Sequence, residues 1–561
     1  MKTVIERIKE ITKSGLKKIS SKYNFSLDGL DIEIEIPKEE KYGDYSTPVA
    51  FNLARSMNIN PFHVARDLLE TLNKINRFFF KKIDLVPPGF INFFLSRKFL
   101  LKELQEISSQ KGNYGKADKD REDKIILEFV SANPTGPLNV VSARAASVGD
   151  ALGNILQFRG KNVFKEYYIN DAGGQVDLLG KSVLYRMKQR SGKRVKLPED
   201  CYQGEYLIDV ATEIMKDKSF YKKIKNLNEK ESIEMIRDYT VKSIVKSQKK
   251  DLKAFQVEFD NWYSENRLRK SKAIDEVLDL LKKKGALYDN EGKVYFRSTS
   301  FGDEKDRVMV REDGTPTYFC VDSAYHLDKF RRGFTQVIDL WGPDHHGYIP
   351  RMKGVLQSMG FTEDSFQVFI VQQVNLLEKN EKIQMSKRAG NFVLMRDLLK
   401  DIGKDAARFF FLHRTLNSHL DFDMELARKQ SDENPVFYVQ YAHARICSIF
   451  KQAESQKAKL PKDRSKIKLD LLAENKEEID LIKKLIDFPD TIREAALKFQ
   501  PGLITGYLLT IAQLFHKFYT EHRVLTKNKS LTLARLYLVE CIKIILKIAL
   551  DLIGIKAPEK M

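Results

Sequence analysis

The chain has 561 residues, and since a single hydrophobic core stops growing near about 250–300 residues, we expect several domains. Hydrophobic residues make up 42% of the chain, which excludes a disordered protein. The formal net charge of +19 favours a polyanionic partner such as nucleic acid, with a generally lysine-solvated surface as the plain alternative. The most apolar stretch, near the C-terminus, is broken by Lys543 and Lys547, so we expect no membrane partner.

The cysteines and the N-terminus indicate where the protein resides. The first 19 residues form an amphipathic helical pattern without the apolar centre of a signal peptide, and Glu6 and Glu10 argue against a transit peptide. The cysteines are far apart and none has C-x-x-C spacing, which argues against a zinc ribbon and favours reduced thiols. We therefore expect a cytoplasmic protein with four free cysteines, Cys201, Cys320, Cys447 and Cys541.

In chain order, the first region alternates helical and extended patterns. It spans residues 1–110 and predicts an α+β domain. The charged, glycine-containing stretch 111–124 is typical of a linker. Residues 120–430 mix strand patterns, such as 336–342 and 366–374, with helical segments. This alternation predicts an α/β domain built on a Rossmann-like parallel sheet.

Two further regions are predominantly helical in pattern. Residues 183–300 are rich in lysine and glutamate, and we interpret them as an insertion with solvated helix faces. From Asn434 to residue 561, apolar residues recur at helical spacing and strand patterns vanish. The last region is therefore predicted to be an all-α bundle.

A nucleotide-binding unit is predicted near residue 130. An apolar run from Ile125 to Val130 breaks into a loop rich in glycine and proline, and a helical pattern begins at about Val140. A strand, a Gly/Pro loop and a helix open many nucleotide-binding folds, because the helix N-terminus offers free N–H groups to phosphate. Glu128 on the strand and Asn133 in the loop are expected to face the same opening.

A second motif lies at Met385, Ser386, Lys387 and Arg388. It places two cations near a small hydroxyl, and Gly390 gives the segment conformational freedom. Alone, such a segment is usually a basic surface loop. Downstream of a nucleotide-binding unit, it predicts a site where Lys387 meets a triphosphate as charge develops on the leaving group.

A third motif places acidic and phenolic side chains on one helix face. Tyr318, Asp322 and Tyr325 follow the spacing i, i+4 and i+7. A carboxylate beside phenolic hydroxyls suits the planar fork of a guanidinium group, which lysine does not imitate. The plain alternative is an aspartate that caps a helix, with two tyrosines that pack.

A fourth motif, at residues 341–352, contains the adjacent histidines His345 and His346. Neighbours on a strand point to opposite faces, and no other set of donors completes a ligand shell. We therefore expect no protein-bound metal.

These motifs, in this order, resemble those of arginyl-tRNA synthetases, which are class I aminoacyl-tRNA synthetases, over residues 43–561. The resemblance implies that ATP and L-arginine form arginyl-adenylate and that arginine then passes to tRNA(Arg), with Mg²⁺ arriving on ATP as substrate. It also implies a monomer whose N-terminal domain touches the tRNA elbow and whose C-terminal bundle reads the anticodon.

The resemblance assigns three sets of binding residues by motif position. The arginine set is Glu128, Asn133, Tyr318, Asp322 and His345, and which of the first two holds the ammonium group stays open. The ATP set is Ala132, Asn133, Pro134, Thr135, Gly136, Pro137, Leu138, Asn139, Val140, Val141, Ser142, Met385, Ser386, Lys387 and Arg388. The tRNA set, which aromatic stacking on bases would serve, is Tyr438, Gln440, Tyr441, His443 and Arg445.

One departure from the family stands in the first motif. Where the family has His-x-Gly-His, this chain has Asn139-Val140-Val141-Ser142, which can donate hydrogen bonds but cannot become cationic. We hypothesise an active enzyme in which Asn139, Ser142, Arg144 and Lys387 act in a variant ATP site. The alternatives are a catalytically impaired paralogue that binds tRNA without aminoacylating it, and a different ligase or nucleotidyltransferase of the same fold.

Overall fold

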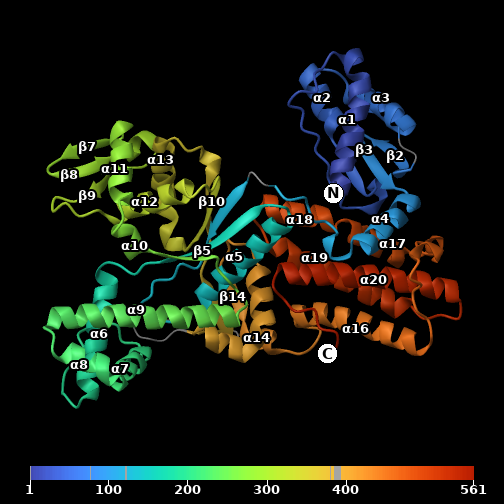
Figure 1. Ribbon diagram of the computed structural model, residues 1–561. Coiled ribbons are helices and arrows are strands. Elements are labelled where there is room, and N and C mark those ends of the chain that lie inside the picture. The colour runs from blue at the N-terminus through green and yellow to red at the C-terminus, as the bar shows by residue number, and fades with distance from the viewer. Residues whose placement is uncertain (1, 76–77, 121–122, 380, 384–392) are drawn as a thin grey trace.

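The protein is described by a computed structural model covering residues 2–75, 78–120, 123–379, 381–383 and 393–561. Figure 1 shows a central sheet with the N-terminal domain and the C-terminal helices on one side and two smaller units on the other. The second motif, Met385 to Arg388, lies outside the described residues.

The N-terminal region is an α+β unit, as its alternating pattern predicts. A capping box begins its first helix, because Thr3 and Glu6 exchange side-chain to backbone hydrogen bonds. Its three strands form an antiparallel sheet in the order β1-β3-β2. The elements are α1 (Val4–Tyr23), β1 (Tyr45–Thr47), α2 (Val49–Met57), α3 (Pro61–Ile75), β2 (Phe80–Val86), β3 (Phe90–Leu95) and α4 (Arg97–Gln110).

The central sheet is parallel and confirms the predicted Rossmann-like fold. Its strand order is β11-β10-β4-β5-β6. From β4 the chain adds β5 and β6 toward one edge of the sheet and later adds β10 and β11 toward the other edge, so the strand order reverses between β4 and β10. In such sheets ligands bind at the carboxyl ends of the strands, beside the reversal. The elements are β4 (Lys124–Glu128), α5 (Val140–Phe158), β5 (Asn162–Ile169), β6 (Asn261–Ser264), α12 (Tyr318–Arg331), β10 (Gln336–Trp341), α13 (Ile349–Met359) and β11 (Phe366–Ile370).

The region 183–300 differs from the single insertion that we predicted. A four-helix unit with its own apolar core comes first, the short strand β6 then returns to the central sheet, and a second unit carries a three-stranded sheet. β6 has only 4 residues, too few for a period-2 pattern to stand out among charged helices. The two units contain α6 (Gly174–Arg190), α7 (Tyr206–Lys216), α8 (Lys218–Lys225) and α9 (Glu229–Ala254), and then α10 (Glu265–Arg269), α11 (Ala273–Lys283), β7 (Leu287–Asn290), β8 (Lys293–Phe296) and β9 (Arg307–Val310).

The last third is mainly helical, and residues 434–561 contain no strand, as predicted. The predicted strand 366–374 is interrupted: β11 ends at Ile370, and Val374 begins β12, which belongs to a different sheet. Every cysteine is buried as a free thiol, and no helix in the described part of the chain is apolar over a membrane-spanning length. The elements are β12 (Val374–Glu378), β13 (Glu381–Lys382), α14 (Met395–Leu412), β14 (Leu420–Asp423), α15 (Met424–Arg428), α16 (Pro435–Ser455), α17 (Lys476–Ile486), α18 (Phe488–Leu497), α19 (Gly502–Glu521) and α20 (Lys529–Leu552).

Candidate active site

A cavity of about 530 Å³ opens at the carboxyl ends of β4, β5 and β10, where the sheet order reverses. The whole predicted arginine set lines this cavity: Glu128, Asn133, Tyr318, Asp322 and His345. These residues come from the end of β4, the loop after it, α12 and the turn after β10. Segments more than 200 positions apart along the chain therefore meet in one place.

Helix α12 presents Asp322 to the cavity from its second turn. Thr317 caps the helix, since its side chain accepts a hydrogen bond from the backbone N–H of Cys320. The alternative reading of Asp322 as a helix cap is therefore wrong. Tyr318, one turn before it, is 52% exposed at the cavity entrance. Tyr325, one turn later, is buried and donates its hydroxyl to Glu166 at 2.8 Å.

Burial makes the Asp322 carboxylate a receptor for a cation. Desolvation raises the pKa of Asp322 to about 6, against the opposing influence of the Tyr348 hydroxyl and of His326. Tyr348 donates its hydroxyl to Oδ2 of Asp322 at 2.7 Å. Glu265, which also lines the cavity, has its pKa raised by burial as well. A bound cation would offset the desolvation of both carboxylates.

The floor of the cavity is a buried network of paired charges. Lys329, with no exposed surface, donates to Oε2 of Glu128 at 2.6 Å and to Oδ1 of Asp339 at 2.9 Å. His326 places Nδ1 at 2.7 Å from the backbone carbonyl of Asp322 and Nε2 at 2.8 Å from Oδ2 of Asp339. Both ring nitrogens of His326 therefore lie within hydrogen-bond distance of an oxygen acceptor.

The sequence prediction missed His326 and Lys329 of this network, as well as Tyr348 and Glu265. The available signal was the face of α12, because His326 and Lys329 continue the i+4 and i+7 spacing from Asp322. Asp339 lies inside an apolar strand pattern, where a buried aspartate itself indicates a paired charge.

The chain leaves β4 through a strained turn. Val130 has φ 69° and Ser131 has φ 35°, in the left-handed region that a β-branched residue rarely adopts. The turn brings the Ser131 hydroxyl to Oε1 of Glu128 at 2.8 Å, and the same hydroxyl accepts the N–H of Tyr168 at 3.0 Å. Both oxygens of Glu128 are thus fixed before any ligand arrives.

The variant residues of the first motif form the cap of helix α5. Oδ1 of Asn139 accepts hydrogen bonds from the backbone N–H of Ser142 at 3.0 Å and from its hydroxyl at 3.2 Å. No acidic residue lies in the first turn, so the positive end of the helix is open to an anion. Pro134, Leu138 and Val140 are buried, and any contact between these three and ATP would involve their backbone.

The described residues that follow the second motif in sequence contact the first motif. Met395 donates its backbone N–H to the carbonyl of Leu138 at 2.9 Å, and Val140 donates to the carbonyl of Val393 at 3.3 Å. The described chain from Val393 onward is thus hydrogen-bonded to the residues that begin α5.

Arg144 requires a correction. Its side chain has no exposed surface, and its guanidinium donates to the backbone carbonyls of Gln372, Gln373, Thr415 and Ser418. Burial lowers the pKa of Arg144 to about 10. The expectation that Arg144 contacts ATP is wrong, because a buried group with several carbonyl partners is not available to a nucleotide.

The predicted tRNA residues lie on α16 in unlike environments. Tyr438 and Tyr441 pack against the ring of His516, and Tyr441 is 40% exposed. Arg445 lies over the ring of Tyr519, and Gln440 donates to Asp405 and to the carbonyl of Lys556. His443 is buried, with Nδ1 at 2.7 Å from the carbonyl of Pro558. His443 is therefore withdrawn from the tRNA set.

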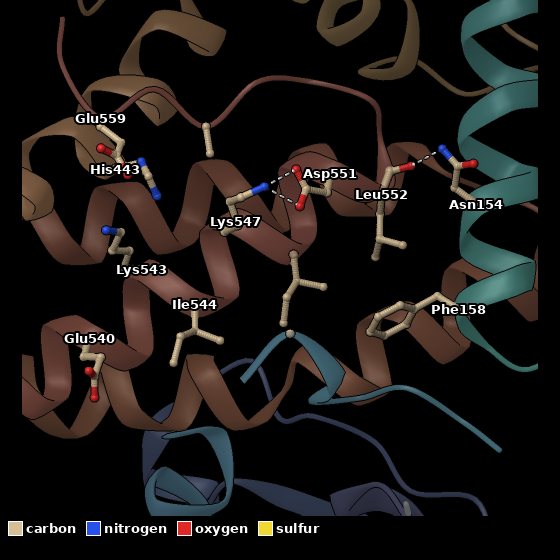
Figure 2. Close-up of a pocket in the computed structure, with 13 residues that line it drawn as sticks. Asn154, Phe158, His443, Glu540, Lys543, Ile544, Lys547, Asp551, Leu552 and Glu559 are labelled. Atoms are coloured by element: carbon tan, nitrogen blue, oxygen red, sulfur yellow. Dashed lines mark hydrogen bonds and ion pairs between the residues drawn. The ribbon is translucent and has the colours of Figure 1, made fainter. Parts of the chain in front are cut away.

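A second cavity, of about 470 Å³, lies between α16, α20 and the end of α5 (Figure 2). Its lining is mainly apolar, and His443 is the one predicted site residue on its wall. None of the described residues of the arginine set or of the ATP set lines this second cavity.

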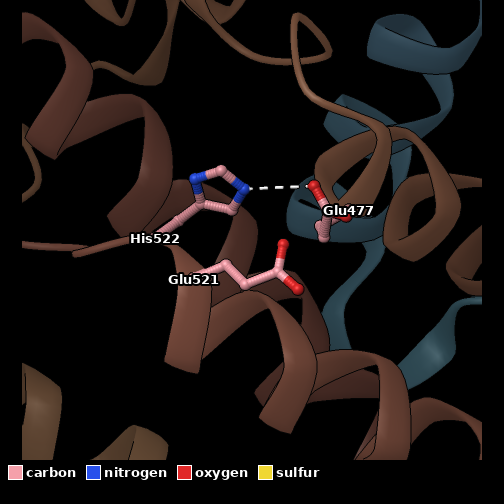
Figure 3. Close-up of side chains that lie close together, drawn as sticks. All are labelled: Glu477, Glu521 and His522. Atoms are coloured by element: carbon pink, nitrogen blue, oxygen red, sulfur yellow. Dashed lines mark hydrogen bonds and ion pairs between the residues drawn. The ribbon is translucent and has the colours of Figure 1, made fainter.

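The placement of the histidine pair on a strand needs a correction. His345 and His346 lie on the short 3-10 helix η4 (Pro343–Tyr348), not on a strand, and both are exposed. Among the described residues, one group has the spacing of metal ligands: Glu477, Glu521 and His522, in the C-terminal bundle (Figure 3). Glu477 already lies 3.1 Å from Nε2 of His522 and 3.2 Å from Nζ of Lys517, so protein side chains occupy both of its oxygens.

Comparisons with known proteins agree with this geometry. Three family models match consecutive parts of the chain: Arginyl tRNA synthetase N terminal domain over residues 6–95, tRNA synthetases class I (R), catalytic domain, over 103–415, and DALR anticodon binding domain over 439–561. The chain is 43% identical to an arginine–tRNA ligase of Geobacillus kaustophilus over 561 residues and 40% identical to that of Bacillus subtilis over 562 residues, with 100% of each chain covered.

Solved structures show the same fold. A putative arginyl t-RNA synthetase from Campylobacter jejuni matches with a TM-score of 0.76 and 36% identity, over 83% of this chain and 100% of that one. The Thermus thermophilus arginyl-tRNA synthetase matches with a TM-score of 0.77 over 100% of both chains, and at 21% identity it supports the fold alone. By its full-length relatives and its family models, the chain belongs to the arginyl-tRNA synthetase family of class I aminoacyl-tRNA synthetases.

Proposed function

We propose that the protein attaches arginine to tRNA(Arg) in two steps, first forming arginyl-adenylate from ATP. The observation that carries this proposal is the cavity lined by Asp322 and Glu265, two carboxylates whose desolvation a cationic ligand would relieve. The cavity is lined in part by Val130, Ser131 and Asn133, from the chain that leads to α5, and a phosphate would bind at the N-terminus of that helix.

Arginine recognition follows from the shape of the acceptors. A guanidinium group presents planar N–H donors to carboxylates, whereas the ammonium group of lysine is a compact point charge. Asp322 is oriented by Tyr348, and Glu265 is oriented by its ion pair with Arg269 at 2.6 Å. Two pre-positioned acceptors therefore favour the side chain that can contact both.

The amino-acid end of arginine would lie toward the β4 edge of the cavity. Glu128 is an ionic acceptor for the α-ammonium group there, and Asn133 is an exposed amide on the same wall. Asn133 donates its Nδ2 to Gln175 at 2.8 Å. This arrangement would direct the arginine carboxylate toward the start of α5 and the bound ATP.

In the first step, a carboxylate oxygen of arginine attacks the α-phosphorus of ATP, and pyrophosphate leaves. We expect Mg²⁺ to arrive with ATP as part of the substrate. The N-terminal N–H groups of α5 and Lys387 would stabilise the charge that moves to pyrophosphate. In the second step, a hydroxyl of the terminal tRNA ribose attacks the arginyl carbonyl, and AMP leaves.

The full-length relatives favour the active enzyme over an impaired paralogue that only binds tRNA. We further propose that the enzyme acts as a cytoplasmic monomer, that α16 contributes Tyr438, Gln440, Tyr441 and Arg445 to the tRNA surface, and that the N-terminal domain meets the tRNA elbow.

Aminoacylation tests the proposal directly. Purified protein is incubated with labelled arginine, ATP, Mg²⁺ and total tRNA, and acid-precipitable arginine is counted. Label that enters tRNA and depends on ATP supports the function. Retention of tRNA without charging would instead identify the paralogue, and charging by lysine at a similar rate would contradict the role of the carboxylates.

A further inference from the structure

The loop between β4 and α5 is hydrogen-bonded to groups outside itself. The backbone carbonyls of Ala132, Thr135 and Gly136 each accept a hydrogen bond from a side chain elsewhere in the protein. Tyr167, from the central sheet, donates to Ala132 at 3.0 Å. The other donors come from the four-helix unit α6–α9.

Gln248, on α9, is one of these donors and has no exposed surface. Its Nε2 lies 3.0 Å from the carbonyl of Gly136 and 3.5 Å from that of Asn133, while its Oε1 lies 3.1 Å from the Tyr167 hydroxyl. Figure 1 shows α9 as a long helix that runs from the four-helix unit back to the central domain. A buried amide whose both ends are engaged holds the loop at a fixed distance from α9.

Tyr206, the first residue of α7, is the other donor, and its hydroxyl bonds to the carbonyl of Thr135. Its ring lies against Gly136, where an added Cβ would meet Cζ and the hydroxyl oxygen of Tyr206 at 3.3 Å. The φ angle of Gly136 is not in the left-handed region, so a close approach of the ring, and not backbone freedom, is what glycine permits here.

We propose that Tyr206 and Gln248 are positioning residues for ATP, holding the loop 132–136 at the geometry that receives the nucleotide. This proposal rests on the proposed function and adds residues that none of the motifs contains. The four-helix unit thereby sets the position of the loop from outside. Because the first motif lacks its two histidines, the site depends on this external support for the placement of its remaining donors.

The test uses substitutions that remove the contacts and keep the side-chain volume: Tyr206→Phe and Gln248→Met. The matched controls are Tyr239→Phe, whose ring packs on Phe220 within the same unit, and Gln189→Met, whose amide donates to Val195 within that unit. For each variant we would measure KM for ATP, KM for arginine and kcat in pyrophosphate exchange with tRNA present, together with the melting temperature.

We expect kcat/KM for ATP to fall about fivefold in Tyr206→Phe, the size of one hydrogen bond, and about tenfold or more in Gln248→Met. KM for arginine should stay within about twofold, because the arginine cavity keeps its own supports. Gly136→Ala should lower kcat/KM for ATP in the same direction, because its added Cβ would lie 3.3 Å from the ring and hydroxyl of Tyr206 and one of the two would have to move.

Equal losses for ATP and arginine, or losses that the control variants share, would overturn the proposal. So would a lower melting temperature with unchanged kinetics, which indicates a purely structural role. If the wild type charges arginine and both variants match their controls, the positioning role fails while the function stands. If the wild type does not charge arginine, equilibrium binding of ATP to the wild type and to Gln248→Met decides the positioning role alone.

Discussion

The cavity proposed for arginine and the loop 132–136 are neighbours, because Asn133 of the loop lines the cavity. Different kinds of interaction hold the two in place. Ion pairs between the elements of the central domain fix the cavity floor, and Lys329 and Asp339 in that floor have no exposed surface. The loop 132–136 is held by side chains that donate to its backbone carbonyls, and two of them, Tyr206 and Gln248, belong to the four-helix unit. The cavity proposed for arginine is therefore held mainly by the central domain, to which α10 of the second unit adds Glu265, whereas the proposed placement of the nucleotide depends on how the four-helix unit packs against that domain.

We expect the largest loss of stability when the ion pairs of Lys329 in the cavity floor are removed. Lys329→Met leaves Glu128 and Asp339 without their shared cation, and breaking a buried pair in this way costs about 3–5 kcal/mol. We expect a strong fall in the free energy of unfolding, measured by urea denaturation. The exposed pair Lys547–Asp551 gives the control, since Lys547→Met should cost under about 1 kcal/mol. Equal costs for the two variants would remove the distinction between the floor and an ordinary ion pair.

The next effect concerns Arg144, which connects α5 to the segments around residues 372 and 415. Arg144→Met leaves buried carbonyls unpaired, at about 1–3 kcal/mol for each group that finds no other partner. We expect a lower melting temperature, whereas the ATP dissociation constant of the folded fraction should stay close to that of the wild type. A variant that melts normally but binds ATP weakly would return Arg144 to the nucleotide site.

A pH titration of arginine binding addresses the cavity alone. Because the pKa of Asp322 is raised to about 6, the carboxyl must lose a proton before it binds a guanidinium group. The dissociation constant should therefore rise as pH falls through 6, by about tenfold between pH 7 and pH 5. Isothermal titration calorimetry should also detect proton release near pH 6.

In Asp322→Asn, arginine should bind much more weakly and this pH dependence should be lost. Any dependence that persists in the variant would belong to Glu265, whose pKa is also raised by burial. An unchanged titration in the variant would exclude Asp322 as the receptor.

The smallest expected effect concerns orientation within the cavity. Tyr348→Phe removes the hydroxyl that donates to Asp322, at about 1 kcal/mol, or about fivefold in arginine affinity at pH 7. The pKa of Asp322 should rise further, since this hydrogen bond holds it down. NMR titration of the Asp322 carboxyl would measure that rise, and a fall in its pKa would contradict the assigned role of Tyr348.

The local elements of the site were predictable from residue spacing. The strand, loop and helix around residues 124–158 and the face of α12 that carries Tyr318 and Asp322 depend on neighbours a few positions away. Sequence spacing did not reveal the role of Arg144, because an arginine at the start of a helix serves a nucleotide or a set of buried carbonyls with equal chemical ease. His443 is a second example, because a histidine on a helix can face RNA or can lie buried beside a backbone carbonyl, as it does here with Pro558.

By itself, the sequence determined the family, the parallel-sheet class, the helical C-terminal region and the motif residues, such as Tyr318 and Asp322, that line the cavity proposed for arginine, since each rests on a motif or on a local period. The tertiary structure alone decided which charges pair, as with Lys329 and Glu128, 201 positions apart, and which side chains hold the ATP loop. The physical reason is that periodicity is set by the backbone of one element. The partner of a buried charge or carbonyl depends on which distant segment packs against it.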